Sequence, residues 1–545
     1  MPAPARSSTS EIKAAPAARA SAATSRSRSP SVGSAGGANP TGGPGGFGGD
    51  IAVAGPLGRL RRGRGPDGWA RGLRRRHRRR GSGRRRKAGG ADPTGGTGGS
   101  GGDVGVGGAD GGGGADREGE PMIEPTEIPV RALMPADLME AKPIYAVWEL
   151  TMKCDQPCQH CGSRAGAARD AELSTEEVLE VAASLARMGC REVALIGGEA
   201  YLREDLAEII SFLARSGMRV IMQTGGRAFT AERAKALRAA GLTGLGVSVD
   251  GPAHIHDELR GNVGSHAAAI RALDNARAAG LITTANTQIN RLNAHLLRET
   301  CAELRSHGIQ TWQVQITVPM GRAADHPEWI LEPWRVVEVI DTLAAIQREA
   351  LETHVSGVPF NVFANNNIGY FGPHEQLLRS RPGGGDTHWR GCRGGINALG
   401  IESDGTVKAC PSVPTVPYAG GNVRERGLEH IWEGSAEVRF ARDRDASELW
   451  GHCATCYYAD ECRAGCSWTA HCTLGRRGNN PFCYHRVTQL KRRGIRERLV
   501  MKQRAPHVPY DHGVFELVEE AWDAPPPPPP EPVVPRNARR RLAVI

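Results

Sequence analysis

The sequence lacks any run of about 18 apolar residues, and its N-terminus has no apolar segment followed by a small-residue cleavage site. We therefore expect neither a membrane-spanning helix nor a secretory signal. Aromatic residues make up 5% of the 545 residues, and residues 1–120 contain no cysteine and two aromatic side chains, Phe47 and Trp69. Such a stretch cannot bury enough apolar surface to offset its chain entropy, so residues 1–121 are predicted to be a disordered, low-complexity Gly- and Arg-rich extension.

Acidic residues are nearly absent between Gly58 and Lys87, where 15 Lys or Arg accompany one acid, Asp67, and give a local charge of +14. The whole chain carries +10, so the remainder is mildly acidic. An arm of this kind either binds the phosphates of nucleic acid or anionic lipid, or is a solvated extension without a partner. Aromatic side chains that would stack on bases are too few here, so we favour the solvated extension and expect neither nucleic acid nor a membrane as a partner.

A disulfide framework is also not indicated. All 13 cysteines fall between Cys154 and Cys483, and their number is odd. Eleven lie in groups spaced like metal ligands, which argues against a secreted disulfide scaffold. Cys190 and Cys301 stand apart and are expected to be small, buried hydrophobic residues. We therefore expect a reducing, cytoplasmic location.

Strand-like and helix-like segments alternate through the middle of the chain. The candidate strands are Tyr145–Leu150, Glu192–Gly197, Met218–Thr224, Gly244–Asp250, Thr283–Ile289 and Trp312–Val318. The candidate helices are Thr175–Met188, Asp205–Ser216, Ala231–Ala240, His266–Ala279 and Ala294–His307. Parallel strands need crossover connections, so six such units predict an α/β fold, a partial (β/α)6 barrel. Active sites of such sheets lie at the C-terminal ends of the strands.

Three cysteines follow the first predicted strand: Cys154, Cys158 and Cys161 are separated by three and two residues. Three thiolates are one short of the four that hold an iron–sulfur cube, which leaves one iron open to a non-protein ligand. A zinc knuckle that borrows a histidine is the structural alternative. The spacing, with His160 before the last cysteine, resembles that of the radical S-adenosylmethionine (radical SAM) superfamily.

This resemblance implies a SAM-binding [4Fe–4S] cluster on the three cysteines and S-adenosyl-L-methionine (SAM) itself as a cofactor. Gly197, Gly198 and Glu199 end the second predicted strand and resemble the family's GGE motif, whose backbone approaches the methionine moiety of SAM; alanine follows where the family usually has proline. Ser248 and Asp250 close the fourth strand and resemble the family's ribose-contacting positions. The alternative for Asp250 is a cap in a strand-to-loop turn.

A second field of cysteines comprises Cys392, Cys410, Cys453, Cys456, Cys462, Cys466, Cys472 and Cys483. All but Cys472 follow the order of the SPASM extension, which carries auxiliary iron–sulfur clusters in radical SAM peptide and protein maturases. The resemblance assigns one auxiliary [4Fe–4S] cluster to Cys453, Cys456, Cys462 and Cys483. It assigns another to Cys392, Cys410 and Cys466, and Cys472 either completes that cluster or is a bystander. A zinc ribbon is the structural alternative for Cys453 to Cys466.

The predicted domains are the extension (1–121), a radical SAM core (140–330), a connecting helical and irregular segment (331–391), a small, loop-rich, Cys-dense SPASM-like domain (392–490) and a disordered Pro- and Arg-rich tail (524–545).

The resemblance implies an enzyme, a radical SAM oxidoreductase or maturase. It cleaves SAM to a 5′-deoxyadenosyl radical and abstracts hydrogen from a substrate, which we expect to be a peptide or protein undergoing post-translational modification. An electron donor such as a flavodoxin or ferredoxin is also implied. A small metabolite or a porphyrin-like precursor is the alternative substrate. A zinc-stabilised nucleic-acid-binding protein is the alternative from a different class. No catalytic acid or base can be assigned from the sequence.

Overall fold

The computed structural model describes residues 140–354, 360–380, 387–389 and 391–528, which fall within one compact unit of the chain. The predictions for residues 1–121 and for residues 529–545 of the tail lie outside the described residues. No helix in the described ranges is long and apolar enough to cross a membrane.

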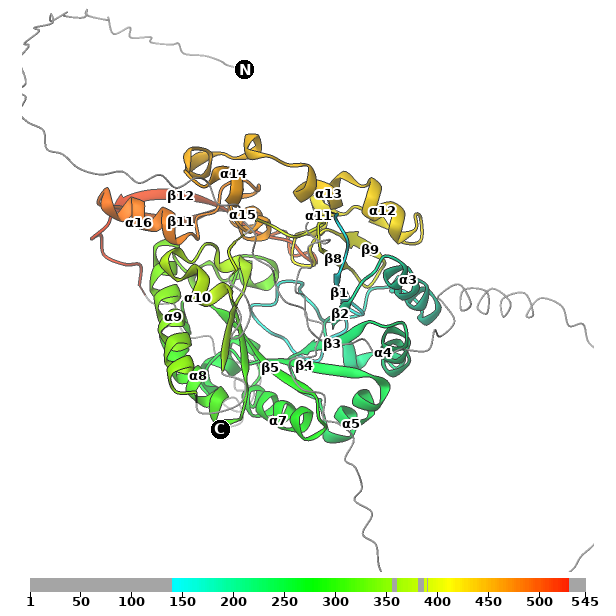
Figure 1. The fold of residues 1–545 in the computed structure, drawn as a ribbon. Coiled ribbons are helices and arrows are strands. Elements are labelled where there is room, and N and C mark those ends of the chain that lie inside the picture. The colour runs from blue at the N-terminus through cyan, green and yellow to red at the C-terminus, as the bar shows by residue number, and fades with distance from the viewer. Residues whose placement is uncertain (1–139, 355–359, 381–386, 390, 529–545) are drawn as a thin grey trace, which may run out of the picture. The chain divides into compact units, whose positions relative to one another are not determined.

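The predicted alternation of strands and helices forms the centre of the molecule (Figure 1). The six strands are β1 (Tyr145–Glu149), β2 (Glu192–Ile196), β3 (Arg219–Thr224), β4 (Leu242–Ser248), β5 (Ile282–Ile289) and β6 (Thr311–Ile316). The helices between them are α3 (Thr175–Arg187), α4 (Leu206–Arg215), α5 (Ala231–Ala240), α6 (Ala253–Arg260), α7 (Ser265–Ala278) and α8 (Leu297–Ser306). All neighbouring pairs from β1 to β6 are parallel, which confirms the α/β partial-barrel prediction.

Local chemistry sets the limits of these helices. Ser174 and Glu177 form a reciprocal capping box at the start of α3, so the first backbone N–H groups of that helix have acceptors. Gly241 ends α5 in the left-handed region at φ 113°, which a residue with a Cβ atom adopts at a steric cost. β4 begins at the next residue, Leu242, beside β3.

The sheet extends beyond the six predicted strands, to ten in the order β10-β9-β8-β1-β2-β3-β4-β5-β6-β7. β7 (Asn361–Ala364) follows α9 (Val336–Glu352) and adds to β6 in parallel. On the other side β8 (Ala398–Ile401) pairs in parallel with β1, and β9 (Thr406–Lys408) and β10 (Gly421–Asn422) follow as antiparallel strands. The cysteine-dense region therefore begins as part of the central sheet.

Short helices recur through the cysteine-dense region, and a hairpin that we did not predict follows them. α10 (Glu375–Arg379) precedes this region, and its helices are α11 (Thr415–Tyr418), α12 (Leu428–Gly434), α13 (Ala436–Asp443), α14 (Ala459–Cys462), α15 (Ser467–Leu474) and α16 (Tyr484–Arg492). The hairpin consists of β11 (Ile495–Gln503) and β12 (Val514–Ala521).

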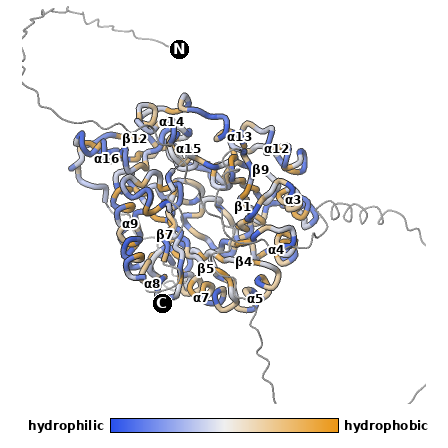
Figure 2. The backbone as a smooth tube through the Cα atoms, viewed as in Figure 1, coloured by the Kyte–Doolittle hydropathy of each residue, from blue (hydrophilic) through white to orange (hydrophobic). Residues whose placement is uncertain are grey.

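Apolar side chains fill the space between the sheet and the surrounding helices. Trp148 of β1 and Trp312 of β6 are fully buried there, and hydrophobic residues recur along the strands in Figure 2. The Trp312 indole N–H donates to the Thr287 hydroxyl, 2.8 Å away, and Trp312 belongs to the same buried apolar cluster as residues of α8 and α9. Alternation along a strand turns the remaining side chains of β5 and β6 to the concave inner face.

A buried network of charged groups joins β1, β9, the turn after β8 and the loop of the hairpin. The Tyr510 hydroxyl, from that loop, donates to the carboxylate of Glu149, and the ammonium of Lys408 lies 3.9 Å from the centroid of the Tyr510 ring. Lys408 Nζ also lies 2.7 Å from Glu402 Oε1. Arg169 pairs with both glutamates. Burial raises the pKa of Glu149 above its usual range, although Arg169 opposes that rise.

We expect Tyr510→Phe to lower the free energy of unfolding by about 1–3 kcal/mol, because Glu149 then loses a buried hydrogen-bond donor. Urea unfolding of the full chain measures the difference. Tyr457→Phe is the matched control: Tyr457 is 89% exposed, so its change should stay within about 0.5 kcal/mol. Equal losses in the two variants would contradict the structural role of the buried hydroxyl.

Candidate active site and metal centres

The loop that carries Cys154, Cys158 and Cys161 leaves β1 without regular secondary structure, and neighbouring strand ends hold it by its backbone. Arg322, which follows β6, donates from Nε to Cys158 O at 2.6 Å and from its backbone N to Cys161 O at 2.8 Å. His160 is buried, and its Nδ1 lies 3.0 Å from Leu259 O in α6. The first predicted cysteine site thus lies at the C-terminal edge of the sheet.

The glycine pair after β2 packs against this loop. Gly198 N donates to Thr151 O at 2.7 Å, and Glu199 N donates to Lys153 O at 2.8 Å. A Cβ atom at Gly198 would lie 2.3 Å from Lys153 O, and one at Gly197 would lie 2.5 Å from Thr151 O. Glycine is therefore required here for close approach of the cysteine loop, and the predicted approach of this backbone to the methionine moiety of SAM stays a prediction.

Glu199 is buried, with both carboxylate oxygens in hydrogen bonds to the end of β3: Thr224 Oγ1 donates at 2.5 Å and Gly225 N at 2.7 Å. Burial raises the pKa of Glu199 to about 7, and the nearby Asp155 contributes to that rise. Ligand atoms of Cys154, Asp155 and Glu199 lie within 4.8 Å of one another. The carboxylate of the GGE motif therefore borders the first cysteine site, and SAM contact by residues 197–199 stays a prediction.

Gln156 also borders the first cysteine site, and we did not predict it as a site residue. Its side chain is buried, and Oε1 accepts a hydrogen bond from Ser265 Oγ at 3.2 Å. The Nε2 amide group is then the donor end of this side chain. That Nε2 has no hydrogen-bond partner among the described residues. A Cβ atom at Gly225 would lie 2.2 Å from it. A glutamine inside a Cys-x3-Cys loop carries no sequence signal that separates it from a solvent-facing residue.

Asp250 is held by groups of the protein itself, and its predicted contact with the ribose of SAM stays a prediction. Its side chain is fully buried: Arg260 donates to Oδ2 from Nε at 2.8 Å and from a terminal nitrogen at 2.6 Å, and Gln288 N donates to Oδ1 at 3.0 Å. His160 Nε2 lies 3.3 Å from Oδ2. The positive Arg260 holds the pKa of Asp250 well below its usual range despite the opposing effect of burial. Asp250 thus anchors α6 and the cysteine loop.

Ser248 is half-buried at the end of β4, and its hydroxyl makes no hydrogen bond within the described part of the chain. Of the two predicted ribose contacts, Ser248 alone keeps a free polar group, and its role stays a prediction.

Amide side chains line the concave inner face of the sheet. The half-buried residues of this set are Gln223, Asn286, Gln288, Gln313, Gln315 and Asn365. Asn286 donates to Gln223, and Asn365 donates to Gln315 Oε1 at 3.1 Å. No hydrogen bond joins the side chains of Gln288 or Gln313 to another described residue.

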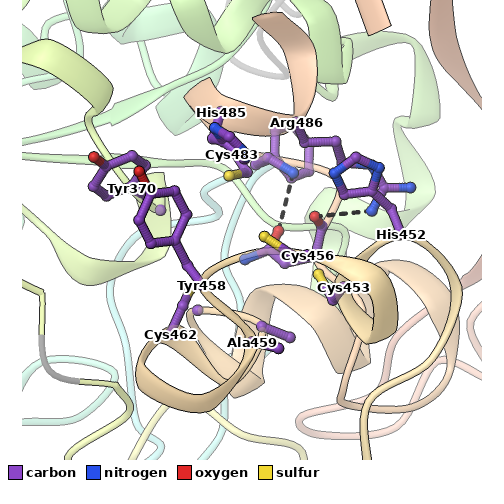
Figure 3. A pocket seen from close by; sticks show the side chains of 15 residues that line it. Tyr370, His452, Cys453, Cys456, Tyr458, Ala459, Cys462, Cys483, His485 and Arg486 are labelled. Atoms are coloured by element: carbon purple, nitrogen blue, oxygen red, sulfur yellow. Dashed lines mark hydrogen bonds between the residues drawn. The ribbon is translucent and has the colours of Figure 1, made fainter. Parts of the chain in front are cut away.

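Four cysteines of the second field line one cavity in the C-terminal region (Figure 3). They are Cys453, Cys456, Cys462 and Cys483, which we call the cysteine tetrad. Burial raises the pKa of Cys462 to about 11 and that of Cys483 to about 12, and neighbouring tetrad thiols add to both shifts. These are the four cysteines that the SPASM resemblance assigns to one cluster.

The remaining cysteines of that field form a second group. Burial raises the pKa of Cys466 to about 12, and Cys392 and Cys410 are near enough to add to the rise. Cys472 is fully buried on α15, and its thiol lies near Cys466 and Cys410. Its Sγ also donates to the Met320 sulfur, 3.6 Å away, at the rim of the barrel. Whether Cys472 is a ligand or a neighbour of this group stays open.

The donor sets fit iron–sulfur clusters. Burial raises the pKa of Cys154 and Cys158 as well, so all three sites gather thiols whose negative charge would be costly without a cation. Bound iron supplies that positive charge, and thiolates are the ligands that hold such clusters. Cys190 and Cys301, by contrast, are buried apart from these groups.

The family comparisons agree with this geometry. Residues 148–321 match the radical SAM superfamily model, and residues 392–457 match the SPASM model, described as an iron–sulfur cluster-binding domain. The chain belongs to the radical SAM superfamily and carries a SPASM domain. It is therefore a SAM-dependent [4Fe–4S] enzyme, and the zinc-stabilised nucleic-acid-binding alternative is wrong.

Among its relatives is the AdoMet-dependent heme synthase of Methanosarcina barkeri, which is 30% identical over 64% of this chain and 98% of that protein. Mycofactocin maturase MftC of Mycobacterium tuberculosis is 30% identical over 67% of this chain and 88% of that protein. The solved structure of native anSMEcpe with bound AdoMet shares the fold, with a TM-score of 0.50 and 17% identity over 64% of this chain and 95% of that one.

We expect Cys456→Ala to remove about four irons per chain from the anaerobically reconstituted protein, because three thiolates of the tetrad hold a cluster poorly. SAM cleavage should persist, since the first cysteine site is intact. Cys301→Ala is the control, because this cysteine is buried in α8 away from the three cysteine sites. The iron content of this variant should be unchanged. Iron content that is the same in both variants would contradict the ligand assignment.

Proposed function

We propose that this radical SAM enzyme modifies a peptide or protein, from which it abstracts a hydrogen atom at the concave face of the sheet. The bound cluster and SAM together supply a 5′-deoxyadenosyl radical. Arg322 and Asp250 keep the cysteine loop in place beside this face, and Gln156 and Glu199 border it on the side of β2 and β3.

The amide-lined inner face carries this proposal. A primary amide both donates and accepts hydrogen bonds, so it complements the N–H and C=O groups of a peptide. The side-chain amides of Gln288 and Gln313 stand on this face without a hydrogen-bond partner among the described residues, which leaves both amides for a substrate. The six amide side chains carry no charge.

A porphyrin-like precursor is the second candidate, because the heme synthase relative aligns over nearly its whole length. The carboxylates of such a macrocycle are matched best by arginine or lysine, and its ring by apolar walls. The inner-face positions of β5 and β6 offer neither basic side chains nor apolar walls. They hold Asn286, Gln288, Gln313 and Gln315. The described geometry therefore favours the peptide.

Two further expectations belong to the proposal. One-electron reduction of a cluster needs a donor such as a flavodoxin or ferredoxin. No disulfide joins the thirteen cysteines, all of which lie among the described residues, and this suits the reducing cytoplasm that we predicted.

We expect Cys158→Ala to abolish 5′-deoxyadenosine formation, because the first site then keeps two of the three thiolates that hold its cluster. Chromatography of anaerobic reactions with SAM and dithionite measures the product. Cys190→Ala, at a buried cysteine outside all three sites, should retain the activity. Persistent product from Cys158→Ala would contradict the assignment of the first site.

The substrate class is tested by deuterium transfer. With a perdeuterated peptide fraction from the host as probe, we expect deuterium in the 5′-deoxyadenosine detected by mass spectrometry. Iron coproporphyrin III, which the name of another relative gives as a product, is the porphyrin probe and should remain unconsumed in parallel reactions. Conversion of the porphyrin without deuterium from the peptides would contradict the peptide proposal and establish the second candidate.

Gln313→Leu should reduce deuterium transfer about tenfold, as expected for loss of one hydrogen bond worth about 1.4 kcal/mol. Substrate-free SAM cleavage should not change. Thr311→Val is the matched control on the same face at the start of β6, and its transfer should equal that of the unaltered enzyme.

A further inference from the structure

Asn480 lies in the turn that leads into Cys483, and its side chain lines the cavity of the cysteine tetrad. It is 2% exposed. The backbone of Asn480 also contributes to this site, because its hydrogen bond to Cys453 favours the thiolate and lowers the pKa of that thiol against the larger effect of burial. Asn480 therefore touches the tetrad through its backbone and faces the same cavity with its side chain.

The orientation of the Asn480 carboxamide is fixed by its neighbours. Its Oδ1 accepts a hydrogen bond from Phe482 N at 3.0 Å, so the group left over is the Nδ2 amide, a donor only. That Nδ2 is buried and has no hydrogen-bond partner among the described residues. A buried N–H group without an acceptor is costly, so its position indicates an acceptor that the protein chain does not provide.

The guanidinium of Arg486, which also lines this cavity, is already engaged. Arg486 donates to Glu497 at 2.5 and 2.7 Å, to Asn479 Oδ1 at 2.6 Å and to Asn480 O at 3.1 Å. Gly465, in the turn between Cys462 and Cys466, keeps the space beside Asn480 open: a Cβ atom there would lie 3.1 Å from Nδ2.

We propose that the Asn480 carboxamide donates an N–H···S hydrogen bond to the iron–sulfur cluster held by the cysteine tetrad, and thereby raises the reduction potential of that cluster. The cluster gains one negative charge when it accepts one electron, and a donor aimed at its sulfur atoms stabilises the more negative, reduced form. Asn480 is a positioning residue in this proposal: it acts on the potential of the cluster and touches no substrate.

The test is a redox titration of the full chain, followed by electron paramagnetic resonance. A background with both Cys158→Ala and Cys466→Ala removes the signals of the first cluster and of the second auxiliary group. Dithionite and ferricyanide with mediators supply and remove the electrons. Asn480→Ala should lower the midpoint potential of the tetrad cluster. Asn480→Asp should lower it further, since it keeps the acceptor for Phe482 N and replaces the donor with a negative oxygen.

Asn479→Ala is the matched control. It removes a side chain of the same size from the same turn, and that side chain binds Arg486 instead of lining the cavity. The proposal predicts that this variant keeps the original potential. An unchanged potential in Asn480→Ala, or an equal fall in Asn479→Ala, would overturn it.

A second measurement covers variants that fail to assemble the cluster. Pulsed electron paramagnetic resonance on protein labelled with ¹⁵N in asparagine side chains should detect a nitrogen coupled to the reduced cluster, because Asn480 is the asparagine among the described residues that line the cavity. Absence of this coupling would overturn the proposal even without a variant. Failure of this proposal can be told apart from a wrong assignment of the tetrad cysteines, because a wrong assignment would leave the iron content of Cys456→Ala unchanged.

Discussion

The structure depends on holding an irregular loop in place at the open edge of a parallel sheet. The loop with the first three cysteines cannot satisfy its own backbone, so the ends of β2 and β6 and helix α6 do so: Gly198, Arg322 and Leu259 each contact it through a backbone or charge-assisted hydrogen bond. The buried pair of Asp250 and Arg260 then fixes α6 against the same loop. The three thiols are thus positioned by groups from four separate segments.

The cysteine-dense region extends this arrangement instead of forming a separate module. Its first strand, β8, is a neighbour of β1 in the sheet, and its helix α15 brings Cys472 within 3.6 Å of Met320 at the barrel rim. The buried network of Glu149, Lys408 and Tyr510 joins the same parts electrostatically. Three thiol sites therefore share one scaffold, and burial raises the thiol pKa at each of them, so metal binding and the stability of the fold are linked.

The features that could be predicted from the sequence are those that depend on hydrophobic periodicity and on the spacing of cysteines. The six core strands were recognised because apolar runs alternate with amphipathic helices, and the cysteine groups because their spacing is specific. The role of Asp250 could not be predicted, because its partners Arg260 and His160 reach it from different elements. The hairpin was missed because three charged residues, Arg496, Glu497 and Arg498, follow one another in β11 and break the alternation typical of a strand. Its burial comes from contacts with distant residues such as Glu332.

The pairing of β8 with β1 has a consequence for synthesis of the chain. Glu149 and Ser403, which hydrogen-bond at this seam, are 254 positions apart in the sequence. The ribosome makes about 5–20 residues per second, so β1 waits on the order of tens of seconds for its neighbour. During that interval its outer edge displays unpaired backbone N–H and C=O groups, which can pair with strands of other chains. The nascent core is therefore most prone to aggregation before its last sheet neighbour is made, and a chain truncated ahead of β8 keeps that exposed edge permanently.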